Sequence, residues 1–255
     1  MPAGKVYLIG AGPGDVKLLT LKAVAALKES DVILIDDLVN PDIVQFAKPS
    51  TPVIHVGKRV GQKSTPQPFI SKLMVSLARE GKCVARVKGG DPLIFARSGE
   101  EIAGLRQEGI DVQIINGITA ALAASSALGL ALSHRDFAHS ITFVTGRSRE
   151  GAQPNWQALA QSGSTLVIYM GVRTLPSIIE RLIQGGLSPH TPAAAVENAS
   201  LPDERHLITS LAQLPSAMRQ NGMGSPAVII IGKVVELSNA LTLSRVVVSQ
   251  SGRLP

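Results

Sequence analysis

Glycine-rich turns follow two short apolar runs of this sequence, and they constrain its fold more than any other feature. Residues 6–9 lead into GAGPGD (10–15), and residues 84–87 lead into KGGDP (88–92). Adjacent glycines at the carboxyl end of a strand let a ligand approach the backbone closely. Open α/β sheets bind their ligands at this edge. The pattern therefore predicts an α/β domain with a ligand site at these turns.

Apolar runs and helical patterns alternate along the whole chain. In the first half we predict strands at 6–9, 32–35, 53–56, 84–87 and 112–115, and the clearest helix at 68–78. In the second half the predicted strands are 141–145, 166–170, 193–196, 206–209 and 227–231, with 246–248 as a candidate edge strand. Only one short helical pattern separates 206–209 from 227–231, which favours a sheet of mixed direction.

These patterns predict an α/β protein of two α/β domains, the N-terminal sheet mainly parallel and the C-terminal sheet mixed. We place the N-terminal domain at 1–128, the C-terminal domain at 129–241 and a polar tail at 242–255. SGEE (98–101) has the spacing of a helix capping box, so Glu101 is expected to cap the helix that begins there.

The charge of the chain indicates an acidic partner. The formal net charge is +6, and the pI is about 9.7. The chain lacks a Lys/Arg run, and its five Phe, two Tyr and one Trp are scattered, so a nucleic-acid partner is not expected. An acidic small molecule fits the charge better.

Composition also indicates the cellular setting. Cys83 is the only cysteine, which excludes an intrachain disulfide and predicts a buried, core-filling thiol. The N-terminus lacks a signal-peptide pattern, and no apolar run approaches the roughly 20 residues that span a bilayer. We therefore expect a cytoplasmic protein without a membrane partner.

The first glycine-rich turn argues against a phosphate-bearing ligand. Asp15 stands where the dinucleotide motif G-x-G-x-x-G has its last glycine, and Pro13 has no N–H to offer a phosphate. A P-loop is excluded because no Lys-Ser or Lys-Thr follows. Acidic, glycine-rich turns suit a compact ligand with a cationic centre and hydroxyls, such as S-adenosylmethionine. The five histidines form no pair on one helix, so no metal is expected.

Nine segments in fixed order resemble the uroporphyrinogen-III C-methyltransferase branch of the tetrapyrrole methylase superfamily. They are GAGPGD (10–15), LTLKA (19–23), VGKR (56–59), KGGDP (88–92), SGEE (98–101), GITAA (117–121), LSHRD (132–136), FVTG (143–146) and YMG (169–171). The resemblance covers about residues 5–238. It implies two α/β domains with S-adenosylmethionine in the cleft between them, and a homodimer. It also implies methylation of two ring carbons of uroporphyrinogen III, giving precorrin-2 for siroheme, cobalamin or haem d1, by a chain without an added oxidase and chelatase module.

The resemblance also assigns roles to individual residues. Asp36 aligns with the proposed proton acceptor of the family and Lys58 with its proposed proton donor. Arg97 is expected to assist proton transfer and to bind substrate carboxylates, with Glu100 orienting it. Arg135 and Arg147 are further carboxylate-binding candidates. The positions aligned with cofactor contacts are Pro13, Gly89, Gly90, Asp91, Ile94, Thr119, Ala120, Met170, Ala199 and Ala227.

Two departures from the family pattern keep alternatives open. Asp37 replaces the usual Arg, and Ala96 and Ser98 replace glycines. Asp37 leaves open a sibling enzyme acting on a later corrin precursor. A more distant alternative is an RNA- or protein-directed relative, or a noncatalytic RNA-binding module, which retention on RNA at physiological salt would reveal.

Overall fold

The computed structural model describes residues 4–57, 65–147, 153–238 and 247–248. The chain forms two compact units, and the division falls between Ala120 and Ala121 rather than after residue 128. Helix α4 (Ala120–Ala127) belongs with the second unit because the Ala121 N–H donates to the Tyr169 hydroxyl at 3.2 Å. The Ser238 hydroxyl likewise donates to the Leu128 carbonyl at 2.7 Å.

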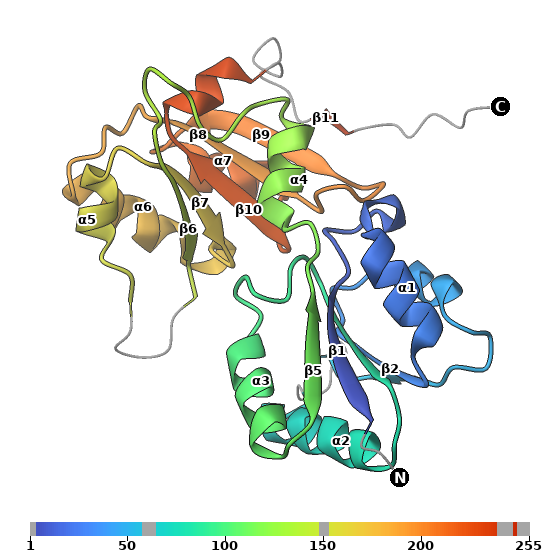
Figure 1. The fold of residues 1–255 in the computed structure, drawn as a ribbon. Coiled ribbons are helices and arrows are strands. Elements are labelled where there is room, and N and C mark those ends of the chain that lie inside the picture. The colour runs from blue at the N-terminus through green and yellow to red at the C-terminus, as the bar shows by residue number, and fades with distance from the viewer. Residues whose placement is uncertain (1–3, 58–64, 148–152, 239–246, 249–255) are drawn as a thin grey trace, which may run out of the picture. The chain divides into compact units, whose positions relative to one another are not determined.

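The first unit contains one parallel sheet of five strands (Figure 1). Its spatial order is β3-β2-β4-β1-β5, and every neighbouring pair is parallel, which confirms the predicted direction. The strands are β1 (Lys5–Gly10), β2 (Val32–Ile35), β3 (Val53–His55), β4 (Val84–Lys88) and β5 (Asp111–Ile115).

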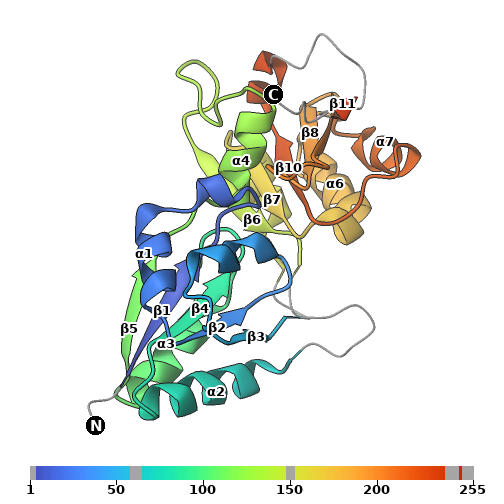
Figure 2. The ribbon, with the colours of Figure 1, turned by 90° about the vertical axis from the view of Figure 1, so that its right-hand side faces the viewer.

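Helices cover both faces of this sheet, as Figures 1 and 2 show. On one face, α1 (Leu21–Glu29) and the 3₁₀ helix η2 (Pro41–Phe46) pack against the sheet. On the other face, α2 (Gln67–Arg79) and α3 (Ser98–Gln107) bury their apolar side chains. Cys83 lies in the first of these cores, as predicted. A short 3₁₀ helix, η1 (Val16–Leu18), follows the first glycine-rich turn.

The second unit contains a mixed sheet of six strands in the order β11-β9-β8-β10-β7-β6. Only β6 and β7 are parallel neighbours, and the other pairs are antiparallel, so the predicted mixed sheet is confirmed. The candidate edge strand also forms, as β11 beside β9. The strands are β6 (Ile141–Thr145), β7 (Thr165–Tyr169), β8 (Pro192–Glu197), β9 (Arg205–Ser210), β10 (Ala227–Ile231) and β11 (Val247–Val248).

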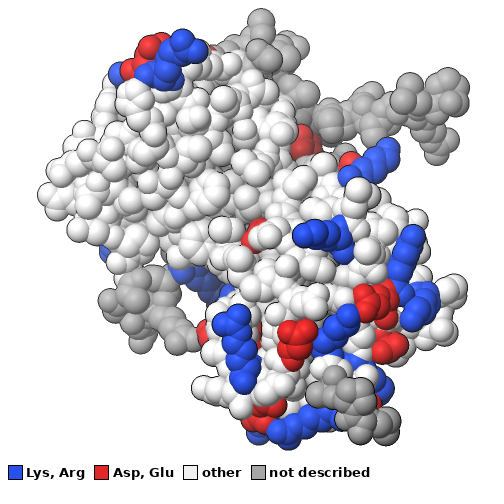
Figure 3. Space-filling view, in the orientation of Figure 1, with Lys and Arg blue, Asp and Glu red and all other residues white. Residues whose placement is uncertain are grey.

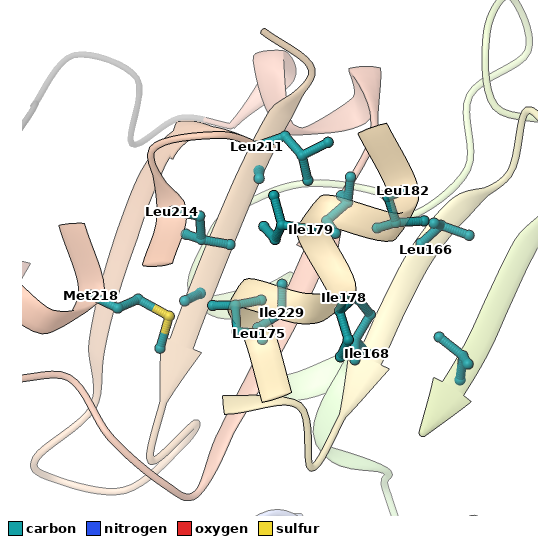
Figure 4. Close-up of a cluster of buried hydrophobic side chains, with 14 of the residues drawn as sticks. Leu166, Ile168, Leu175, Ile178, Ile179, Leu182, Leu211, Leu214, Met218 and Ile229 are labelled. Carbon is teal, nitrogen blue, oxygen red and sulfur yellow. The ribbon is translucent and has the colours of Figure 1, made fainter. Parts of the chain in front are cut away.

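Three helices of the second unit pack on one face of its sheet. These are α5 (Trp156–Gln161), α6 (Leu175–Gln184) and α7 (Leu214–Gln220), with the short 3₁₀ helix η3 (Val172–Thr174) leading into α6. Figure 4 shows Ile178, Ile179 and Leu182 of α6 against Ile168 and Leu166 of β7. Helix α4 lies on the opposite face (Figures 1 and 2), and the 3₁₀ helix η4 (Lys233–Leu237) follows β10.

Charged side chains are distributed unevenly over the face drawn in Figure 3. Lysine and arginine alternate with aspartate and glutamate over the elements of the first unit, whereas few charges lie over those of the second. Among the residues that the structure describes, no helix is long and apolar enough to cross a membrane.

Candidate active site

Three loops of the first unit meet through their backbones where β1, β4 and β5 end. The Gly12 and Gly90 backbones exchange two hydrogen bonds, at 3.1 and 2.7 Å. A Cβ added to Gly10 or to Gly117 would lie within 3.0 Å of neighbouring backbone atoms, among them the Gly90 carbonyl oxygen. Gly90 itself has φ +67°, in the left-handed region that favours glycine. The glycine-rich turns therefore build a single backbone junction at this sheet edge.

The carboxylate of Asp91 fastens the same junction. Its Oδ1 accepts a hydrogen bond from the Leu93 N–H at 2.8 Å. Its Oδ2 accepts from the Asn116 side-chain amide and from the Gly117 N–H, both at 3.1 Å. Asp91 thus joins the loop after β4 to the loop after β5. Asp91 therefore has a structural role in holding the two loops together, and its predicted contact with the cofactor stays a prediction.

The other predicted cofactor residues of the first unit surround this junction. Gly89 and Ala120 are half-buried, Thr119 is buried, and a Cβ on Gly90 would lie 3.8 Å from both Thr119 and Ala120. Pro13 and Ile94 are half-buried in the first and second loops. Asp15 of the first turn accepts a hydrogen bond from the Lys17 N–H at 2.9 Å and caps η1.

Asp36 belongs to an ion-pair network at the end of β2. Its Oδ1 accepts from Arg86 Nη2 at 2.8 Å, and its Oδ2 lies 4.0 Å from Lys88 Nζ. Both cations project from β4, which neighbours β2 in the sheet. Asp36 keeps 29% of its side chain exposed, whereas the side chains of Arg86 and Lys88 are 2% and 4% exposed.

Glu101 completes this network and does not cap its helix. It is fully buried, accepts from Arg86 Nε at 3.2 Å and from Lys88 Nζ at 3.0 Å, and also accepts from the Gln67 amide at 2.7 Å. No side chain caps α3, and the Ser98 hydroxyl is buried without a hydrogen-bond partner among the described residues. The predicted capping box is therefore wrong. Glu101 pairs instead with the two buried cations, Arg86 and Lys88, because leaving these charges unpaired in the interior would cost several kcal/mol.

Burial also acts on Lys88 itself. It lowers the pKa of the ammonium, and the neighbouring Arg86 charge lowers that pKa further, while Glu101 and Asp36 oppose the shift. An ammonium whose charge is held by two carboxylates is sensitive to any change in either of them.

Arg97 and Glu100 form an exposed pair at the start of α3. The guanidinium donates to both Glu100 oxygens, from Nε at 3.0 Å and from Nη2 at 2.7 Å. This pairing raises the pKa of Arg97 above its already high ordinary value. The guanidinium therefore stays charged and is suited to binding a carboxylate, not to accepting a proton. Glu100 contacts it as an orienting residue would, and that role stays a prediction.

Three predicted residues of the second unit lie at one edge of its sheet. Met170 follows β7, Ala199 follows β8, and Ala227 begins β10, which is antiparallel to both strands. Arg147 follows β6, whose end is joined to β7 by a 2.7 Å hydrogen bond from the Gly146 N–H to the Tyr169 carbonyl. This edge thus gathers four of the predicted positions.

One described residue among those predicted, Arg135, is not brought to these edges. Arg135 is exposed in a turn that precedes β6 and is closed by hydrogen bonds between the His134 and Ala138 backbones. Arg135 and Arg147 lie beyond opposite ends of β6. Lys58 lies outside the described residues. Asp37 packs against the Gly57 backbone, immediately before Lys58 in the chain, so that a Cβ on Gly57 would meet it.

Backbone strain coincides with the predicted site. Five described non-glycine residues have φ between 51° and 69°, a region that costs free energy for an ordinary side chain. Arg97 and Met170 are themselves predicted site residues, and the other three, Phe95, Asn198 and Ser200, directly neighbour predicted ones. Strain of this kind collects at functional sites, and it marks the same edges that the motifs indicate.

The motifs did not reveal Arg86, Lys88 and Glu101. A signal was present, because the strand VARVK (84–88) carries two cations in a segment that is buried throughout. Lysine and arginine are almost never fully buried without a partner. A carboxylate facing β4 was therefore predictable, although its identity was not.

Comparison with known proteins identifies the family. The model of the tetrapyrrole (corrin/porphyrin) methylases matches residues 5–215. The chain belongs to the tetrapyrrole methylases. It is 47% identical over 244 residues to a uroporphyrinogen-III C-methyltransferase of Pseudomonas aeruginosa, covering 95% of this chain and 99% of that protein.

Solved structures and longer relatives agree with this assignment. A uroporphyrin-III C-methyltransferase of Thermus thermophilus, solved with S-adenosylhomocysteine, superimposes with a TM-score of 0.79 at 39% identity, covering 92% of this methylase and all of that chain. A cobalt-precorrin-4 methyltransferase superimposes with a TM-score of 0.82 at 31% identity, covering 91% of this methylase and 95% of that chain. A siroheme synthase of Chromobacterium violaceum is 44% identical, and this methylase spans 52% of its length.

Proposed function

We propose that this methylase transfers methyl groups from S-adenosylmethionine to two ring carbons of uroporphyrinogen III and forms precorrin-2. Similarity over nearly the full length of the Pseudomonas aeruginosa enzyme carries this proposal. Precorrin-2 formed here would supply the synthesis of siroheme, cobalamin or haem d1. We also propose a cytoplasmic homodimer, on the resemblance of the motifs.

The glycine junction suits the methyl donor. Small residues at Gly89, Gly90 and Ala120 leave backbone groups open to approach, and no phosphate-binding motif competes for them. Met170 is 47% exposed, has a strained backbone conformation and offers an apolar, polarisable surface. S-adenosylmethionine supplies an electrophilic methyl group on a sulfonium.

The remaining chemistry needs orientation and removal of a proton. A pyrrole carbon of a porphyrinogen is a good nucleophile, so positioning it against the methyl group provides much of the acceleration. The proton released after the new carbon–carbon bond forms passes to Asp36, whose partly exposed side chain follows the end of β2. Arg97, Arg147 and Arg135 bind carboxylates of the substrate, which carries eight of them.

A later corrin precursor is the second candidate substrate. The match to a cobalt-precorrin-4 methyltransferase and the acidic Asp37 both favour it. The two substrates are separated by incubating the enzyme with enzymatically made uroporphyrinogen III and labelled S-adenosylmethionine, followed by mass analysis. Two added methyl groups support the proposal. Binding of S-adenosylhomocysteine without any methyl transfer to uroporphyrinogen III would instead favour the corrin precursor.

A further inference from the structure

Four charges form a balanced group behind the edge of the first sheet. Arg86 and Lys88 of β4 carry two positive charges, while Asp36 after β2 and Glu101 of α3 carry two negative ones. The side chains of Arg86, Lys88 and Glu101 are at most 4% exposed, and only Asp36 reaches solvent. Burying charges in this way costs free energy that a core of apolar side chains would avoid.

Arg86 is the connecting member of the group. Its Nε donates to Glu101 at 3.2 Å, and its Nη2 donates to Asp36 at 2.8 Å. A third donor, Nη1, is bound to the Val87 carbonyl at 3.3 Å. The planar guanidinium is thus fixed from two sides, and it fixes one oxygen of Asp36 in turn.

We propose that Arg86 and Lys88 are positioning residues for the methyl-transfer reaction, Arg86 by holding the Asp36 carboxylate in place and Lys88 by stabilising its negative charge. Glu101 balances both cations in the interior. The proposal rests on the proposed function, because it assigns a purpose to the group around the proton acceptor. It explains why a costly buried ion network lies directly behind a half-exposed carboxylate.

The charges that face Asp36 determine the sign of the expected effect. Arg86 and Lys88 from β4 contact Asp36 directly, and Glu101 from α3 is bound to both of these cations. The other titratable groups nearby in the sheet or the chain are Asp37, which is adjacent in sequence, and His55, whose backbone pairs in register with Ile35. A cation 4.0 Å away favours the ionised carboxylate. Removing Lys88 therefore withdraws one of the two cations that stabilise the ionised form of Asp36.

The test measures single-turnover methyl transfer to uroporphyrinogen III as a function of pH. For Lys88→Met we expect the acidic limb of the profile to move up by about 1 pH unit, with the plateau rate nearly kept. In Lys88→Met, Glu101 keeps its hydrogen bonds to Arg86 and Gln67, so its buried charge stays paired and the variant is expected to fold. Arg86→Lys keeps the positive charge but loses the planar guanidinium that binds Asp36 and Glu101 through separate nitrogens. For this variant we expect a plateau rate about 10–100-fold lower, with little movement of the acidic limb of the pH profile.

Two controls separate position from general stability. Lys82→Met removes a lysine from an exposed ion pair with Glu80 in the same unit, and it should change neither the limb nor the plateau. Affinity for S-adenosylhomocysteine, measured by calorimetry, should stay within about twofold for every variant. Thermal unfolding reports separately whether a variant is folded.

The possible failures are distinguishable. If the wild-type enzyme transfers no methyl group to uroporphyrinogen III, the proposed function is wrong. If the wild type is active and Lys88→Met is folded with an unmoved limb, Lys88 has only a structural role and the inference is overturned for it. A folded Arg86→Lys enzyme with the wild-type plateau overturns it for Arg86.

Discussion

Asp36 and Arg97 show how differently two charged residues of one site are held. Asp36 is anchored through one oxygen by the buried Arg86, its second oxygen lies 4.0 Å from the buried Lys88 ammonium, and 29% of its side chain remains exposed. Arg97, directly before α3, forms an exposed pair with Glu100 of that helix, and such a pair contributes little to stability. Asp36 is therefore rigid and suited to proton transfer, whereas Arg97 is free to exchange Glu100 for a substrate carboxylate.

Replacing Asp36 by Asn should remove basicity while keeping size and shape. We expect kcat to fall by about 10²–10⁴-fold, with unchanged affinity for S-adenosylhomocysteine. Steady-state kinetics and calorimetry check both quantities. Asp42→Asn is the control, because Asp42 is exposed in η2, away from the network. Single-turnover methyl transfer at the wild-type rate would show that Asp36 has no part in proton transfer.

Replacing Arg97 by Ala should weaken the binding and turnover of the porphyrinogen far more than the affinity for the cofactor. Loss of one charge-assisted pair is expected to cost about 1.5–3 kcal/mol in kcat/KM. The matched control is Arg79→Ala, which breaks a similar exposed pair with Glu108. The assignment fails if Arg97→Ala loses cofactor affinity and keeps its turnover of porphyrinogen at saturating cofactor.

At the scale of elements, the strands were predictable and their partnerships were not. A short, continuous run of apolar and β-branched residues marks a strand whatever its direction, so β2, β6 and β10 have the predicted bounds. Glu101 was misjudged because its spacing from Ser98 is local information, whereas Arg86 and Lys88 reach it from another strand. The edges that carry the site were predictable from the glycine turns, and the ion network behind Asp36 was not.

We expect a glycine-to-alanine substitution to have opposite effects on stability inside the glycine junction and outside it. Gly117→Ala places a Cβ against the backbones of Gly10 and Gly90, so it should destabilise the first unit by about 1–3 kcal/mol. Gly104→Ala in α3 meets nothing within 4 Å and should stabilise by up to about 1 kcal/mol. Urea unfolding measures both. Equal effects from the two substitutions would contradict the close packing at Gly117.

At the scale of the whole molecule, the two units have separate cores and separate sheets. The cofactor positions predicted from the resemblance are divided between them, with seven positions up to Ala120 in the first unit and Met170, Ala199 and Ala227 in the second. A ligand that uses both groups of residues links the stability of the two units.

Binding of S-adenosylhomocysteine should therefore stabilise both units together. At 100 times its Kd the ligand adds about 2.7 kcal/mol to whichever folded state binds it. Differential scanning calorimetry, with Trp156 fluorescence reporting on the second unit, follows the two units separately. If only one transition moves to higher temperature, the ligand contacts that unit alone.

The backbone junction of Gly10, Gly90 and Gly117 has a consequence for how such a protein can diversify. The backbones of the three loops are in direct contact, with no side chains between them that could repack. None of the loops can therefore be lengthened or shortened without displacing the other two. New specificities are then expected to arise beside the junction, at positions such as Asp37 and Leu38 or Leu93 and Phe95, whose side chains are exposed. An engineer seeking altered substrates would randomise those positions and leave the three turns at their present lengths.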